Sequence, residues 1–274
     1  VHYFVAAGRA ENALAVVHPR ERELAWQTVT AILGGALREV KDPGRDSVID
    51  SYLLSELFKS LRDRTDINQR ELAHWEYAYF PVLWNQNVDL ALYDRMASDP
   101  EFFVSILKDV FFADGVDPGE MESTPEQRNR SAVSHSILIQ NKKVPGETSE
   151  AIDQESLDTW VDGMLEEGRK QKLTKIVPTY IGKTIAYAAE TNGVWPPHEV
   201  AKVIERLRSD DVERAIMIER FNMRGVYVKE LFEGGRQERN LAAQYQGWAD
   251  ANGVFPRTKA MLTTSAERWD RDAT

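Results

Sequence analysis

The densest group of residues that could bind a ligand lies between residues 222 and 239. Two glycine sites alternate there with arginines and a lysine. If Gly234 and Gly235 let the backbone approach a ligand just before a helix, exposed amides and guanidinium groups could hold a carboxylate or a phosphate. Neighbouring glutamates nearly balance these cations, so salt bridges within the chain are the alternative. The residues predicted for this anion site are Arg224, Arg236, Arg239, Tyr245 and Arg257.

Aromatic side chains crowd residues 75–84. Trp and Tyr are common anchors at binding surfaces, and this cluster is therefore a candidate partner groove. Because helical spacing points these side chains in several directions, only some of them could reach a partner, and the others belong to the core. The residues predicted for the groove are Trp75, Tyr79 and Trp84.

Acidic residues occur in two settings that could carry chemistry. Glu76 lies among aromatic residues, where burial would raise its pKa and make it a candidate acid. Helical periodicity lets it face water instead, and that outcome is expected. Asp114, Asp117, Glu120 and Glu122 share one loop. Their spacing departs from a calcium-binding loop, so a solvated loop is expected.

The familiar motifs of catalysis and cofactor binding do not occur in the sequence. It holds no phosphate-binding GxxxxGK[ST], no GxGxxG, no HExxH and no GxSxG. No two of its five histidines lie within four residues of each other, so the helical spacing of metal ligands is missing. We predict no catalytic residue, no cofactor and no metal site.

Charge and composition restrict the class of protein and of partner. The net charge of −10 disfavours nucleic acid, which binds clustered cations. The longest apolar stretches are far shorter than the roughly 20 residues that a membrane helix needs. Zero cysteines exclude disulfides and thiolate sites and fit a reducing compartment. A cytoplasmic protein without membrane contact is expected.

The elements that must position these residues are helices. Apolar residues recur with helical spacing along most of the chain, and breakers such as Asp42-Pro43-Gly44 and Asp99-Pro100 separate the segments. The fold class predicted is all-α. The helices expected cover 19–40, a segment capped by Asp46 or Ser47 and ending near Arg64, 68–84, 88–97, 100–112, 126–140, a segment opened by Ser156, 174–190, 197–208, 210–222, 235–251 and 256–272.

One short pattern occurs twice. Asn192-Gly193-Val194-Trp195-Pro196 is followed sixty residues later by Asn252-Gly253-Val254-Phe255-Pro256. In each copy Asn-Gly can supply a left-handed residue that closes one helix, and Pro can open the next. Two unrelated corners with the same common turn residues are an equal alternative. The pattern favours stacked helical hairpins, either HEAT/armadillo-like or an irregular α-solenoid.

The domain organisation expected is a division near residue 148. A polar stretch with Val144-Pro145-Gly146 would separate an N-terminal helical subdomain, 1–148, from a C-terminal helical-hairpin subdomain, 149–274. The chain begins with Val1 and has no basic segment that would mark a signal peptide. It is therefore expected to be part of a larger parent protein.

Several segments carry a resemblance to a known class. They are Tyr79-Phe80-Pro81, Asp99-Pro100-Glu101-Phe102-Phe103, Asn222-Met223-Arg224-Gly225, the run from Glu233 to Ala242, Phe255-Pro256-Arg257-Thr258 and Ala266-Glu267-Arg268-Trp269. This pattern resembles the C-terminal α-helical regions of large, mostly uncharacterised bacterial multidomain proteins. The resemblance implies upstream ATPase-like or effector modules and a defence role for the parent protein. It implies no catalytic residue in this chain.

Together these features predict a non-catalytic recognition or scaffold region of a bacterial cytoplasmic protein. Its partner would be another protein or another domain of the parent chain, because stacked hairpins offer an extended binding face. The first alternative is an enzyme or anion-binding domain whose pocket combines dispersed Arg, Glu and Tyr residues. The second is a nucleic-acid-binding domain, which would need a continuous basic face.

Overall fold

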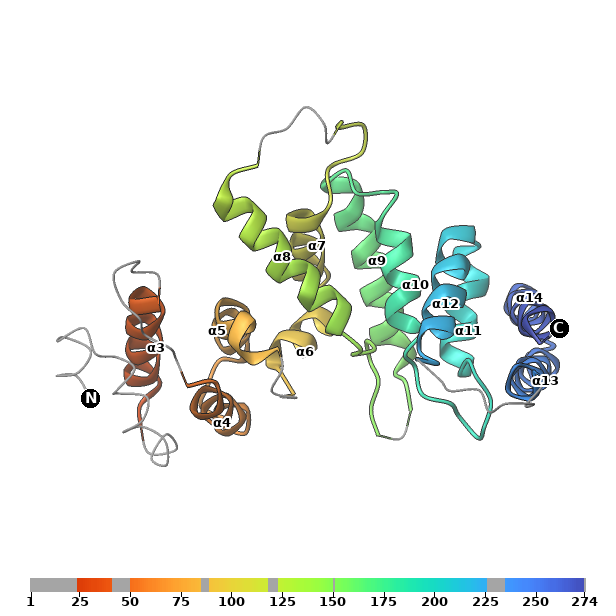
Figure 1. Cartoon of the computed structure of the whole chain (residues 1–274), viewed down its shortest axis with the longest axis horizontal. Helices are drawn as coiled ribbons and strands as arrows, with labels where there is room; N and C mark the ends of the chain where they lie inside the picture. Colours follow the sequence, from red (N-terminus) through yellow and green to blue (C-terminus); the bar gives the residue numbers. More distant parts are fainter. Residues whose placement is uncertain are drawn as a thin grey trace. The chain divides into compact units, whose positions relative to one another are not determined.

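The computed structural model of this protein describes residues 24–40, 50–84, 89–117, 123–149, 151–225 and 235–273. Within these ranges the chain forms α-helices and no strand, apart from isolated backbone bridges between Glu147 and Ile152 and between Thr191 and Val194 (Figure 1). The prediction of an all-α fold is confirmed.

Two compact units divide the chain, and each is described by itself. The first unit consists of residues 1–96 and 123–140, and the second of residues 97–122 and 141–274. The expected division was a single cut near residue 148. In the structure, residues 97–122 belong to the same unit as residues 141–274. Each unit therefore consists of two separate stretches of sequence, which a single boundary cannot describe.

The described residues of the first unit form four helices and most of a fifth, whose apolar faces meet in one core. α4 packs against α5, and α5 also contacts α3 and α8. Phe58, Tyr79 and Phe80 are almost completely buried there, and the rings of Phe58 and Tyr79 lie 6.0 Å apart. The helices are α3 (Trp26–Val40), α4 (Ser51–Arg62), α5 (Gln69–Leu83), α6 (Ala91–Ser98) and α8 (Pro125–Gln140).

Local sequence explains where the helices of the first unit begin and end. Asp50 caps α4 by accepting hydrogen bonds from the amides of Tyr52 (2.9 Å) and Leu53 (3.2 Å), so the expected cap at residue 46 or 47 was wrong. α5 passes through Pro81 and ends two residues later. The start expected at Pro19 lies outside the described residues.

Seven helices lie in the described part of the second unit, and Asp99 and Pro100 begin the first of them. Asp99 accepts a hydrogen bond from the amide of Phe102 (3.1 Å), and Pro100 occupies the first helical position, as predicted. The helices are α7 (Pro100–Val110), α9 (Gln154–Lys170), α10 (Val177–Ile185), α11 (His198–Leu207), α12 (Asp210–Asn222), α13 (Arg236–Ala251) and α14 (Pro256–Asp272).

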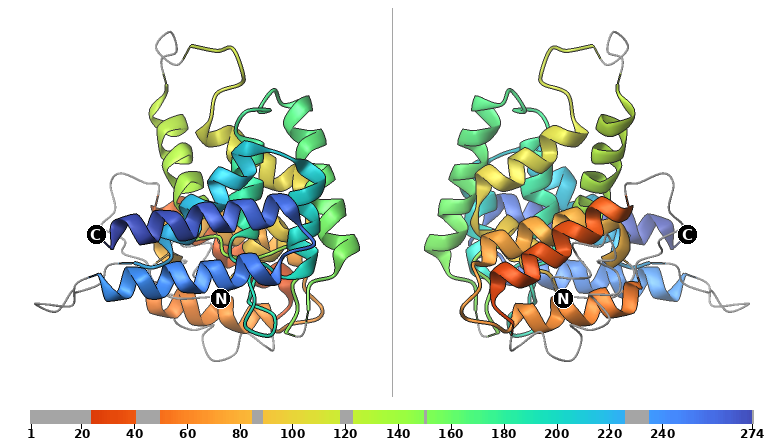
Figure 2. Two further views of the ribbon diagram at one scale, coloured as in Figure 1. Left: turned by 90° about the vertical axis from the view of Figure 1, so that its right-hand side faces the viewer. Right: turned by 90° about the vertical axis from the view of Figure 1, so that its left-hand side faces the viewer.

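Helix contacts connect α7 to α14 in the second unit, and several of them join helices that are not neighbours in the sequence. α7 packs on α9, α9 contacts α10 and α11, and α10 packs closely on α12. α11 and α12 contact α14, which runs antiparallel beside α13 (Figure 2). Phe103 of α7 lies 5.6 Å from the ring of Trp160 and 6.3 Å from that of Tyr180, which explains why α7 belongs to this unit.

The two copies of the repeated pattern differ in backbone but lie against each other. Asn192 and Gly193 have positive φ, whereas Asn252 has φ −90°, so the prediction of a left-handed residue holds only in the first copy. The amide nitrogen of buried Asn252 donates to the carbonyls of Trp248 (2.9 Å) and Trp195 (3.3 Å). The repeated corner is thus a contact between the segments before α11 and α14.

Candidate functional site

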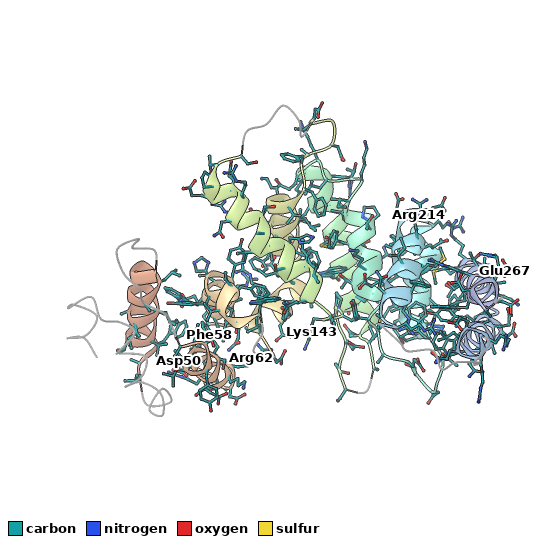
Figure 3. The ribbon with its side chains drawn as sticks, in the orientation of Figure 1. Asp50, Phe58, Arg62, Lys143, Arg214 and Glu267 are labelled. Carbon is teal, nitrogen blue, oxygen red and sulfur yellow. The ribbon has the colours of Figure 1, made fainter. Side chains whose placement is uncertain are left out.

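A cavity in the described part of the second unit lies between α12, α13 and α14. It has a volume of about 270 Å³, and we call it the arginine pocket. Figure 3 labels Arg214 on α12 and Glu267 on α14, two of the helices that form it. The lining residues are Arg214, Met217, Ile218, Phe221, Tyr245, Thr264, Ser265, Arg268, Trp269 and Arg271.

Helical spacing explains why these side chains share one pocket. Arg214, Met217, Ile218 and Phe221 follow one another at intervals of three, four and seven residues from the first, so they occupy one face of α12. On α14, Thr264, Arg268 and Arg271 repeat at similar intervals. The contact between α12 and α14 brings the two faces together.

Two aromatic rings and two guanidinium groups form a stack beside the pocket. The rings of Phe221 and Trp269 are nearly parallel, at 15°, with centroids 4.6 Å apart. The guanidinium carbon of Arg268 lies 4.1 Å from the centroid of Phe221, and that of Arg224 lies 4.9 Å from the centroid of Trp269. Cation–π contacts of this kind hold a guanidinium by its face. The N–H donors in the plane of Arg268 can therefore serve another group.

The charge of the pocket lining is positive. It includes three arginines and no carboxylate, although the whole chain carries a net charge of −10. Arg214 forms one exposed ion pair, 3.6 Å from Asp211, and such pairs contribute little to stability. No carboxylate of the described residues pairs with Arg268. The pocket is thus a local cationic site in an acidic protein.

Tyr245 places a polar group in the same pocket. Its side chain is 5% exposed, and its ring lies 4.9 Å from that of Trp248. Among the described residues, none forms a hydrogen bond with its hydroxyl group. Tyr245 can therefore donate a hydrogen bond to a bound ligand.

What this arrangement can do follows from its chemistry. Comparison with protein-family models, with curated proteins and with solved structures found no match to this chain.

Guanidinium groups bind carboxylates and phosphates through paired N–H donors. The apolar floor formed by Met217, Ile218 and Phe221 can bury a hydrophobic group. The arginine pocket is therefore suited to a ligand that is both anionic and apolar.

Of the residues predicted for an anion site, only Tyr245 lies in the pocket lining. Arg224 lies outside the lining, with its guanidinium group over the ring of Trp269. Arg224 donates to Glu238 (3.2 Å), which is buried. Arg257 pairs with Glu213 (2.6 Å) and Asp210 (2.8 Å) elsewhere. Arg236 and Arg239 are exposed on α13 and do not line the pocket. For Arg224 and Arg257 the structure therefore shows the salt bridges that were the alternative interpretation.

Sequence reasoning missed Arg214, Arg268, Arg271 and Phe221. Their signal was present as helical periodicity, because each set occupies one face of its helix. The sequence does not show that these two faces meet, since that contact depends on how the helices pack. The anion site was predicted from arginines that lie close to glycines in the sequence, and these arginines do not line the pocket.

The predicted aromatic groove is not formed by its three residues together. Tyr79 is 1% exposed, and its hydroxyl donates to the carbonyl of Leu33 (2.6 Å), so it belongs to the core of the first unit. Trp84 is 50% exposed at the end of α5. Trp75 is partly buried, with its ring 6.2 Å from that of His74. At most Trp75 and Trp84 can offer surface to a partner.

Glu76 is buried, and the expectation that it faces water was wrong. One carboxylate oxygen accepts a hydrogen bond from the amide of Leu92 (2.6 Å) at the start of α6, and the other has no partner. Burial raises its pKa from 4.5 to about 7, against the opposing effect of the amides of Leu92 and Ala91. Glu76 thus acts as a cap for α6.

The acidic loop does not gather metal ligands in its described part. The carboxylate of Asp114 accepts hydrogen bonds from the amide (2.8 Å) and hydroxyl (2.6 Å) of Thr174. These bonds lower the pKa of Asp114. Glu120 and Glu122 lie outside the described residues. Over the ranges that the structure describes, no cluster of three metal-ligating side chains occurs, and no helix is long and apolar enough to cross a membrane.

Proposed function

We propose that this chain is a helical recognition region that binds a protein partner, or another domain of a larger parent protein, at the arginine pocket. The observation that carries the proposal is the composition of the lining, in which three arginines surround an apolar floor without any carboxylate. Protein interfaces are enriched in arginine and aromatic residues around pockets that receive a partner side chain. Ile218 in the lining is 44% exposed, so a partner can bury this side chain.

The order of helix contacts in the second unit supports a stacked architecture. α9 contacts α10 and α11, α10 contacts α12, and α11 and α12 contact α14, which packs on α13. An irregular α-solenoid, or a HEAT-like arrangement, would produce contacts of this kind and would present its outer helices to a partner. The bacterial, cytoplasmic and defence-related context implied by the resemblance stays a prediction.

A photo-crosslinking amino acid placed at residue 264 tests the proposed function. Thr264 is exposed on the pocket face of α14, whereas Lys259 is exposed on the same helix. Five residues at about 100° each separate the two positions by about 140°. We expect a discrete protein adduct from position 264 and none from position 259, when the protein is irradiated in cells that express it. Equal labelling from both positions, or no adduct at 264, would reject a protein partner at this pocket.

The unpartnered hydroxyl of Tyr245 favours a second candidate, a binding site for a small anionic ligand. A volume of about 270 Å³ lies just below the range of about 300–1,000 Å³ that is usual for drug-sized ligands. Native mass spectrometry of the purified protein would detect such a ligand as a defined added mass that Tyr245→Phe reduces. Nucleic-acid binding stays a prediction that salt-dependent binding would test.

A further inference from the structure

We propose that the segment bound by the arginine pocket is an acidic helix, which inserts one large apolar side chain between α12 and α14. This inference rests on the proposed function and specifies the chemistry of the partner. Its carboxylates would meet Arg214, Arg268 and Arg271, and its apolar side chain would lie on Met217, Ile218 and Phe221. Three properties of the pocket carry the inference.

The first property is the apolar floor. Met217, Ile218, Phe221 and Trp269 line the pocket, and apolar atoms supply most of its exposed surface. Burying such a surface against an aliphatic or aromatic side chain is favourable because it removes apolar area from water. A purely charged ligand would leave this floor exposed. The segment must therefore carry at least one large apolar residue.

The second property is the unused hydrogen-bonding capacity of Arg268. Arg268 is held by its face on Phe221, at 4.1 Å, and no carboxylate of the described residues pairs with it. A guanidinium group fixed in this way presents its planar donors for bidentate binding of a carboxylate. The hydroxyl of Tyr245 adds a further donor. The segment must therefore carry carboxylates beside its apolar residue.

The third property is the spacing of the rim along two helices. Arg268 and Arg271 are one turn apart on α14, and Arg214 begins the lining face of α12. A cavity lined by neighbouring helices can receive an amphipathic helix, which presents its contact residues at intervals of three and four. Acidic residues one turn apart on the bound helix would face the arginines in pairs.

Fluorescence anisotropy with three labelled synthetic peptides tests the inference on the full chain. The peptides have about 15 residues, a length at which an alanine-rich helix begins to form. The first carries Glu at turn spacing around a central Leu and Phe. The second replaces Leu and Phe with Ala, and the third replaces Glu with Lys. We expect saturable binding of the first peptide alone, weakened by added NaCl.

Variants of the protein locate the binding. Arg268→Glu should weaken binding of the first peptide by about tenfold or more, because it replaces attraction with repulsion at the rim. Thr264→Trp should block the pocket without altering the charge. Lys259→Glu makes the same charge change as Arg268→Glu, away from the pocket on α14, and should leave binding unchanged. Circular dichroism of each variant confirms that the helices are retained.

The results separate this inference from the proposed function. If none of the peptides binds, if all acidic peptides bind alike, or if Lys259→Glu acts like Arg268→Glu, the acidic-helix inference is wrong. Crosslinking at position 264 still decides whether a protein occupies the pocket. A crosslinked partner whose attached segment is neutral or basic would uphold the proposed function and overturn this inference. Self-adducts at position 264 would identify a second copy of the chain as the occupant.

Discussion

Single residues decide where charge can be buried in this protein, and Glu76 is the clearest case. Its carboxylate is fully buried and accepts a hydrogen bond from the amide of Leu92, at the positive end of α6. Arg62 favours its ionised form, whereas Asp89 opposes it. The nearby phenol of Tyr93 has a raised pKa, mainly through burial and also because of Glu76. The side chain of Glu76 on α5 thus holds the backbone of α6 through a hydrogen bond whose strength depends on the protonation of the carboxyl group.

Replacing Glu76 by Gln should reduce the pH dependence of stability. The carboxyl has a pKa of about 7 in the folded chain and an ordinary value of 4.5. Between these values the folded state binds more protons, so the free energy of unfolding falls as pH rises and levels off above about 7. The difference corresponds to about 3 kcal/mol. Glu76→Gln should lack this fall, as measured by urea unfolding between pH 5 and 8.

Glu56→Gln is the matched control for that measurement. Glu56 lies on α4 of the same unit and pairs at the surface with Lys59, an interaction of little weight. Its variant should reproduce the pH profile of the unaltered chain. Parallel profiles for Glu76→Gln and the unaltered chain would show that the buried carboxyl does not control the pH dependence.

What the sequence predicts at the residue scale depends on how local the cause is. Asp99 and Pro100 were correctly predicted as a helix start, because both effects act within one turn. The burial of Glu76 was not, since it depends on α6 approaching α5 from a separate part of the chain. The same limit hid the arginine pocket, where Arg268 and Phe221 come from helices separated by α13.

At the scale of elements, periodicity predicted most helices well and their contacts poorly. The expected segments 210–222 and 256–272 coincide with α12 and α14. Their apolar spacing is a property of the segment itself. The close packing of α10 on α12 has no such signal, because it depends on Gly182. A side-chain Cβ at Gly182 would lie 2.4 Å from the carbonyl oxygen of Val212 and 2.9 Å from the Cβ of Ala215.

Two helical glycines should respond to alanine in opposite directions. Gly182→Ala should destabilise the chain by about 1–3 kcal/mol, because α10 and α12 must separate to admit the methyl group. Gly247→Ala on α13 should stabilise it by about 0.5–1 kcal/mol, since nothing lies within 4 Å of the new Cβ and alanine favours the helix. Denaturant unfolding of both variants measures the two effects. A stabilising Gly182→Ala would contradict the close approach of α10 to α12.

At the scale of the whole molecule, the chain divides into two compact units whose boundary the sequence did not reveal. Polar breakers near residue 146 marked a turn, but the division depends on which segments pack together. α7 precedes that turn and yet belongs to the second unit, where Phe103 lies between Trp160 and Tyr180. Predicting this from sequence would require knowing that α7 and α9 pack together, although α8 separates them in the sequence.

Phe103→Ala in the full chain should loosen the second unit selectively. Phe103 is 1% exposed, and removing a buried phenylalanine ring costs about 3–5 kcal/mol. Hydrogen exchange should therefore become faster in α9 and α10, while α4 and α5 of the first unit keep their protection. Phe112→Ala removes a ring that is 44% exposed on the same segment and should change neither set of helices. Equal acceleration in α4 and α9 after Phe103→Ala would mean that the two units unfold together. The units of the contact division would then not be independent units of stability.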